Sequence, residues 1–235
     1  MAKINLSRRA EIGQERRART RAILVSAATT LIAMRPIEAI TVDEIVKEAG
    51  VAKGTFYVHF VDMDALIVAV AEEFIDDIDQ AFQPQRISME DPLTRVAFGC
   101  AFFIERAIND PAWGMVVGRM ASTYPWVGER ARKRLLEDLE QAYRLTPVNR
   151  RRVQPAVALE VVTGILLQTL VAIGQGRLNA TQARTAISAI LSSIGVEGRS
   201  MASIIKRVTT QLSNPAAQWS TLASTLATVQ ADRRR

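Results

Sequence analysis

Seven consecutive residues of this 235-residue chain hold four polar side chains that could meet a nucleic acid, namely Lys53, Thr55, Tyr57 and His59. Their ammonium, hydroxyl and imidazole groups can donate hydrogen bonds to phosphate oxygens and to acceptor atoms on base edges. Gly54 has no side chain, so a ligand backbone can approach closely there. Phe56 and Phe60 are four residues apart and would share one face of a helix, packed inward. The segment therefore predicts a short helix that enters a DNA groove.

A preceding helix and a tight turn are needed to present such a segment, and the sequence indicates both. Thr41 followed by Glu44 has the capping-box pattern, so we expect a helix to begin there. Gly50 suits the left-handed conformation that ends a helix, and the next helix then spans about 52–59. The hydroxyl of Thr41 and the nearby backbone amides could hold a further phosphate. We therefore expect a helix-turn-helix motif at about 41–60.

The positive charge of the chain is concentrated at its N-terminus. Residues 1–21 hold seven basic and two acidic side chains, although the net charge of all 235 residues is only +6. A basic arm at 1–15, continued by Arg16 and Arg17, would suit double-stranded DNA, because lysine and arginine displace counterions from phosphates. The alternative is a solvated, disordered tail.

The single cysteine and the apolar stretches indicate the cellular compartment of the chain. Cys100 lies among phenylalanines, so we expect a buried small hydrophobe and a reducing, cytoplasmic environment. Residues 161–176 carry no charge, but they are too few to span a bilayer comfortably. We therefore expect no membrane partner.

Two other classes of function are weaker alternatives. An enzyme is not expected, because the one histidine and the one cysteine lie in different regions and no phosphate-binding or metal-ligand spacing occurs. We likewise expect no cofactor and no metal. A helical interaction module, or one that binds membrane surfaces through the basic arm, leaves the arrangement at 53–59 unexplained.

Helical periodicity runs through the chain and strand patterns are scarce, so we expect an all-α fold. A first helix should span about 11–34, and a connecting helix should occupy 63–82. Gln83-Pro84 then opens the clearest linker, at 83–92. The remaining helices are expected between prolines and glycines, at about 93–109, 112–122, 126–144, 153–175, 179–194, 199–212 and 215–230.

The segment TVDEIVKEAGV, followed by KGTFYVHF and then Leu66, resembles the TetR family of bacterial transcriptional regulators. The resemblance covers about 16–74, and it implies a cytoplasmic bacterial protein that lies on the nucleoid when bound to DNA. It implies an all-helical homodimer with a three-helix DNA-binding domain, here 16–62, and a C-terminal ligand-binding and dimerisation domain, here 93–235 with extra C-terminal helices. By position, it implies DNA contacts from Thr41, Lys53, Gly54, Thr55, Tyr57 and His59.

The chain departs from the family pattern at two positions. Met63 stands where the family usually has a lysine that binds a phosphate, and Asp62 and Asp64 flank it. That phosphate contact is expected to be lost, and the basic arm could replace it from the minor groove. Ala52 stands where a hydroxyl cap is common, so the second helix of the motif should be weakly capped.

Large side chains gather in the region 93–126 and could line a small-molecule site. The candidates are Phe102, Trp113, Met120, Tyr124 and Trp126. The alternative is that they form the core, as aromatic residues at helical spacing commonly do. Few charges lie among them, so an effector would be hydrophobic or aromatic.

Two apolar helices, at 157–173 and 183–194, could pair with their copies in a homodimer or could simply form the core of one subunit. The resemblance favours the dimer. Together these features predict a DNA-binding transcriptional regulator, a ligand-responsive repressor that binds a palindromic operator as a dimer.

Overall fold

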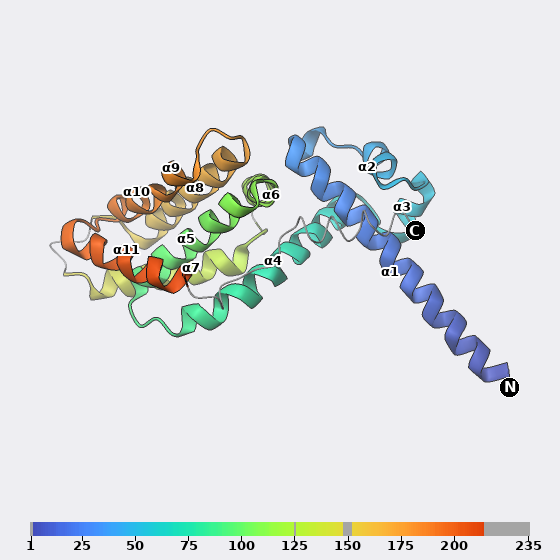
Figure 1. The fold of residues 1–235 in the computed structure, drawn as a ribbon, viewed down its shortest axis with the longest axis horizontal. Coiled ribbons are helices and arrows are strands. Elements are labelled where there is room, and N and C mark those ends of the chain that lie inside the picture. Colours follow the sequence, from blue (N-terminus) through green and yellow to red (C-terminus); the bar gives the residue numbers. More distant parts are fainter. Residues whose placement is uncertain (1, 125, 148–151, 214–235) are drawn as a thin grey trace. The chain divides into compact units, whose positions relative to one another are not determined.

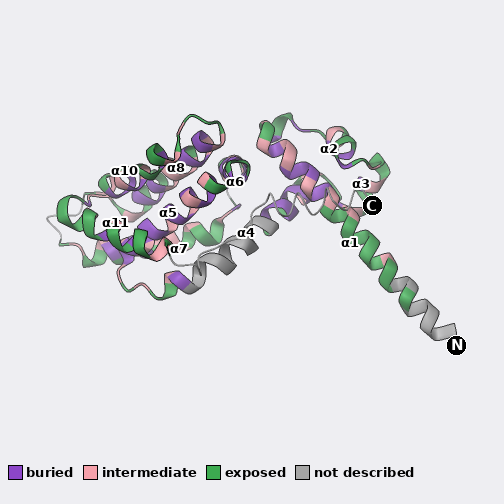
Figure 2. Cartoon of the chain, viewed as in Figure 1, coloured by how far each residue is buried: buried purple, intermediate pink, exposed green. Residues whose placement is uncertain are grey.

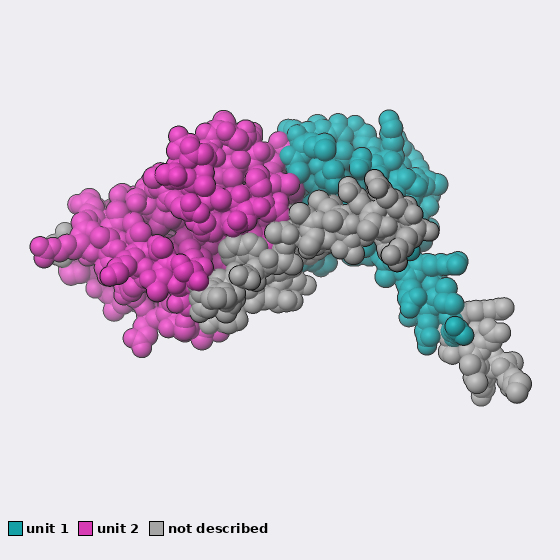
Figure 3. Space-filling model, viewed as in Figure 1, with its two compact units in different colours: residues 1–73, 226–235 teal, residues 74–225 magenta. Residues whose placement is uncertain are grey.

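The computed structural model describes residues 2–124, 126–147 and 152–213, and their regular structure consists of helices, with no strand (Figure 1). The all-α prediction is therefore confirmed for the described part of the chain. The chain divides into two compact units, residues 1–73 and 74–225 (Figure 3). The helix predicted at about 215–230 lies outside the described residues.

Unit 1 contains the predicted three-helix domain. Its elements are α1 (Ala2–Met34), a short 3-10 helix η1 (Ile37–Ala39), α2 (Val42–Ala49), α3 (Lys53–His59) and the start of α4 (Met63–Ile87). The first helix begins nearer the N-terminus than predicted, so residues 2–15 are helical. The described buried residues of α1 lie in its second half, from Leu24 onward (Figure 2). Helix α1 contacts α2 and α3. The other buried apolar residues of unit 1 include Ile45, Phe56, Phe60, Leu66 and Val70.

Helix α4 is longer than the sequence indicated. It continues through Pro84 to Ile87, so the predicted loop at 83–92 shrinks to 88–91. Proline removes one helical hydrogen bond, but this is a local cost that tertiary contacts can offset. Here Arg86, in the last turn of α4, donates to Asp138 at 2.9 Å and holds that turn in place.

Unit 2 contains seven further described helices in the positions that the prolines and glycines predicted. They are α5 (Pro92–Asn109), α6 (Pro111–Thr123), α7 (Glu129–Leu145), α8 (Pro155–Gly174), α9 (Ala180–Arg184), α10 (Ala186–Ser193) and α11 (Gly198–Leu212). Proline opens α5, α6 and α8, where its missing N–H costs nothing. The helix predicted at 179–194 is split at Thr185, whose hydroxyl donates to the carbonyl of Gln182 at 2.6 Å.

Helix α6 lies in very close contact with α5 and α8, because glycines stand at the contact points. A Cβ atom on Gly114 would lie 2.6 Å from Cβ of Ala107, and one on Gly118 would lie 2.7 Å from Cγ2 of Val171. From the other side, a Cβ on Gly174 would lie 2.9 Å from Cε of Met115. These distances are shorter than carbon atoms tolerate, so the helices approach backbone to backbone.

Helix α8 is, by length and composition alone, able to cross a membrane. It has 20 residues, because it begins six residues before the uncharged run at 161–176 and includes Glu160. The bent pair formed by α3 and the start of α4 also passes that test. Helix α8 packs against α5, α6, α7 and α10, however, as the core helix of a helical domain does.

Candidate nucleic-acid interface

The start of α2 is fixed by the predicted capping box. Oγ1 of Thr41 accepts from the backbone N–H of Glu44, and Oε2 of Glu44 accepts from the backbone N–H of Thr41 at 2.9 Å. Arg35 donates to the other carboxylate oxygen at 2.7 Å. Hydrogen bonds from Arg35 and then Thr41 lower the pKa of Glu44 to about 2. The prediction of the helix start is confirmed.

The turn between α2 and α3 also has the predicted geometry. Gly50 adopts φ 68°, the left-handed conformation, and its N–H is bonded to carbonyls of the preceding turn. Ala52 precedes α3 and makes no side-chain capping hydrogen bond, as expected for a residue without a hydroxyl group. Phe56 is fully buried and Phe60 is 3% exposed, with ring centroids 5.8 Å apart. These two rings anchor α3 to the domain from beneath.

The outer face of α3 carries the predicted polar groups. Lys53, Gly54 and Tyr57 are exposed, Thr55 and His59 are half-buried, and Thr41 is exposed at the start of α2. The Tyr57 side chain is 55% exposed although its ring contacts Phe56 edge-on at 5.2 Å. A Cβ on Gly54 would meet nothing within 4 Å, so the helix surface is open at this point. A ligand can therefore approach the donor side chains of α3, whereas the hydroxyl of Thr41 donates to Oε2 of Glu44 at 2.8 Å.

An acidic residue that the sequence analysis did not select lies on the same surface. The ammonium of Lys53 lies 2.9 Å from Oδ1 of Asp43 and donates to its Oδ2 at 3.1 Å. This hydrogen bond raises the pKa of Lys53. Asp43 is ten positions earlier, on another helix, so neither helical periodicity nor a local motif points to the pair.

Around the start of α4, Asp62 has a role that the sequence analysis missed. Its Oδ1 accepts from the backbone N–H of Ala65 at 2.8 Å, so it caps α4. The sequence identifies Asp62 only as a residue that flanks Met63. Met63 itself is half-buried.

The candidate N-terminal contacts lie on a helix. Arg8, Arg16 and Arg17 are exposed side chains of α1. Farther along, the guanidinium of Arg21 lies over the ring of Phe60, 5.2 Å from its centroid. The basic surface of α1 therefore reaches the end of α3 inside unit 1.

The five candidate effector residues differ in burial. Phe102, Trp113 and Met120 are at most 1% exposed and belong to the core of unit 2. Tyr124 is half-buried and Trp126 is 41% exposed, with their rings 5.7 Å apart. The burial of the first three fits the core alternative, and an effector role for all five stays a prediction.

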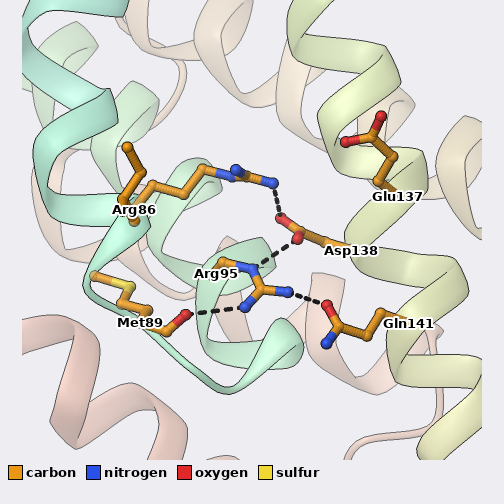
Figure 4. A pocket seen from close by; sticks show the side chains of 7 residues that line it. Arg86, Met89, Arg95, Glu137, Asp138 and Gln141 are labelled. Atoms are coloured by element: carbon orange, nitrogen blue, oxygen red, sulfur yellow. Dashed lines mark hydrogen bonds and ion pairs between the residues drawn. The ribbon is translucent and has the colours of Figure 1, made fainter.

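A polar cavity of about 270 Å³ lies elsewhere in unit 2 and contains none of those residues (Figure 4). Its lining is Arg86, Ile87, Met89, Arg95, Glu137, Asp138 and Gln141. Both oxygens of the Asp138 carboxylate accept from arginines, at 2.9 Å from Arg86 and 2.7 Å from Arg95.

Arg95 completes this network from α5. It donates to the backbone carbonyls of Met89 and Glu90, both at 2.9 Å, and to the side chain of Gln141. The network ties the end of α4 and the loop after it to α5 and α7. The hydrogen bonds of Arg86, Arg95 and Asp138 are made within the network, so we interpret its role as stabilising unit 2.

Comparison with known proteins bears on both units. Residues 24–70 match the sequence model of a family described as bacterial regulatory proteins, tetR family. The uncharacterized HTH-type transcriptional regulator YvdT of Bacillus subtilis (strain 168) is 38% identical over 52 residues, 22% of this chain and 27% of that protein. The chain thus matches little more than a quarter of the length of its curated relatives.

Solved structures match over more of the chain. The crystal structure of RolR with its ligand resorcinol has a TM-score of 0.55 and 26% identity, and the match covers 83% of this chain and 96% of RolR. A gamma-butyrolactone receptor described as ArpA-like has a TM-score of 0.60 and 20% identity, over 83% of this chain and 97% of the receptor. The second similarity is one of fold.

Proposed function

We propose that the chain is a member of the TetR family of bacterial regulatory proteins, whose sequence model matches residues 24–70, and that it is a ligand-responsive repressor that binds a palindromic operator as a dimer. The observation that carries the proposal is the outward polar face of α3, held in place by the buried rings of Phe56 and Phe60. A helix so presented fits the major groove.

Each polar residue of the face has a proposed role on DNA. Lys53, at the N-terminal end of α3, is placed to meet base edges, as in other helix-turn-helix proteins. Thr55, Tyr57 and His59 would donate to phosphates, and Thr41 would hold a phosphate at the start of α2. Arg16 and Arg17 on α1 would add backbone contacts, which fix position without reading sequence.

The proposed dimer would use α8 and α10. Helix α8 is apolar on nearly every side, and it leaves Val157 55% and Val161 37% exposed. Exposed aliphatic side chains on a helix of this kind favour a partner helix. Two subunits would then place two α3 helices about 34–36 Å apart, one turn of DNA, to read a palindrome.

The proposed effector is a small hydrophobic or aromatic molecule held in unit 2. RolR, whose structure contains resorcinol, supports an aromatic ligand for a chain of this fold. Helix α4 begins in unit 1 and ends in unit 2, so it is the proposed route by which a ligand alters DNA binding. Such a ligand must bind one conformation better than the other, because equal binding changes no equilibrium.

Fluorescence anisotropy of the full chain with random duplex DNA tests the DNA-binding part of the proposal. We expect binding that weakens steeply with salt, and weaker binding for Tyr57→Ala and His59→Ala. Lys206→Ala, an exposed lysine of α11 in unit 2, is the control and should bind as the wild type does. A wild-type chain with no DNA affinity at low salt would show that the proposal is wrong.

A further inference from the structure

We propose that Asp43 and Lys53 together read one G·C base pair in each half of the operator, with Lys53 donating to guanine and Asp43 accepting from cytosine. The inference rests on the proposed function, because it needs the face of α2 and α3 to lie on DNA. Asp43 has no role in the proposed function. Here it becomes a residue that determines specificity for the DNA sequence.

The pair stands at the outer surface, between the first turns of two helices. Asp43 is the second residue of α2 and Lys53 is the first residue of α3. The two oxygens of the carboxylate lie 2.9 and 3.1 Å from the ammonium. The side chains are 70% and 54% exposed, so both remain open to a ligand while they touch each other.

We expect this pair to add little to the stability of the fold. Exposed ion pairs contribute little to stability, because water screens them and two long side chains must be ordered. The start of α2 is already held by the capping box of Thr41 and Glu44. Asp43 is therefore available for a contact with DNA on this surface.

A carboxylate on this surface works against simple phosphate binding. It repels phosphates, and it accepts hydrogen bonds but cannot donate them. The groups on DNA that it can bind are the amino groups of cytosine and adenine in the major groove. Lys53 has the opposite requirement, since an ammonium needs acceptors such as O6 and N7 of guanine.

One G·C pair meets both requirements side by side. O6 of guanine and N4 of cytosine are hydrogen-bonded to each other, so an acceptor and a donor are adjacent on the groove edge. Lys53 and Asp43 present the complementary donor and acceptor at a hydrogen-bond distance from each other. An A·T pair also has two acceptors, N7 of adenine and O4 of thymine, but they lie on opposite sides of its amino group. Guanine presents O6 and N7 side by side to one ammonium, so G·C is favoured.

The test is a binding selection from a duplex library with a random centre, using the full chain. Wild type, Asp43→Ala and Lys53→Ala are compared, and Asp64→Ala is the matched control, because it removes an exposed aspartate from the same unit. We expect the wild type to require G·C at one position per half-site. Asp43→Ala and Lys53→Ala should each lose that preference by roughly tenfold or more at the same position, and Asp64→Ala should keep it.

A second measurement separates specificity from overall charge. On DNA without the site, Asp43→Ala should bind at least as tightly as the wild type, because a negative charge is removed from the face. If Asp43→Ala keeps the full preference at every position, or changes it at an A·T pair, the inference is wrong while the proposed function stands. If the wild type selects no sequence and binds no DNA, the proposed function itself is wrong.

Discussion

The buried carboxylate of Asp138 offers the sharpest test of what holds unit 2 together. Its side chain is 5% exposed and lies between the guanidinium groups of Arg86 and Arg95, whose side chains are 16% and 11% exposed. The substitution Asp138→Asn keeps the shape but removes the charge. Arg95 keeps its bonds to the loop carbonyls and to Gln141, whereas Arg86 loses its charged partner.

The expected cost follows from that geometry. A hydrogen bond to a charged group contributes about 1.5–3 kcal/mol. Removing one member of a buried ion pair costs about 3–5 kcal/mol. Since one arginine of two keeps other partners, we expect Asp138→Asn to lower the free energy of unfolding by about 3 kcal/mol. At about 2–4 °C per kcal/mol for a chain of this size, Tm should fall by roughly 6–12 °C.

Thermal unfolding followed by circular dichroism, with urea unfolding followed by tryptophan fluorescence, measures this loss. The control is Glu137→Gln, since Glu137 is the neighbouring residue on α7, lines the same cavity and is exposed. That change should stay within about 0.5 kcal/mol of wild type. If the two variants differ by less than about 1 kcal/mol, the two arginines are solvated and the network does not stabilise unit 2.

Three further predictions concern packing, pH and the thiol. Gly114→Ala should lower the free energy of unfolding by about 1–3 kcal/mol, because the new Cβ would lie 2.6 Å from a methyl carbon of α5. Gly164→Ala on α8 meets nothing within 4 Å and should raise that free energy by up to about 1 kcal/mol. Urea unfolding measures both changes. Hydrogen bonds from Arg35 and Thr41 lower the pKa of Glu44 from 4.5 to about 2. The wild type should therefore be more stable than Glu44→Gln above pH 4.5, and this difference should vanish as the pH falls toward 2. Unfolding of both proteins measured over that pH range tests this. Burial raises the pKa of Cys100 to about 12, so a thiol reagent at mildly alkaline pH should label it only as fast as the chain unfolds.

The parts of the fold that depend on neighbouring residues were predictable from the sequence. The capping box at Thr41, the left-handed Gly50 and the prolines that open helices act within a few residues, so their patterns are visible along the chain. The inward face of α3 was predictable for the same reason, since Phe56 and Phe60 follow helical spacing.

The errors involve contacts between distant residues. The extension of α4 past Pro84 accompanies the bond from Arg86 to Asp138, which are 52 positions apart. The pairing of Lys53 with Asp43 depends on the angle between two helices, which no single helix determines. The burial of Trp113 likewise depends on packing between helices, which residue type alone does not determine.

The close approach of α6 to α5 and α8 restricts where an effector can fit. At Gly114, Gly118 and Gly174 even one added methyl group would overlap a neighbouring atom. An aromatic ring is far larger than a methyl group, so it cannot be admitted between these helices at those points. A ligand cavity in unit 2 must therefore be lined by other faces of these helices. Substitutions that change the size of such a cavity during evolution must occur on those faces.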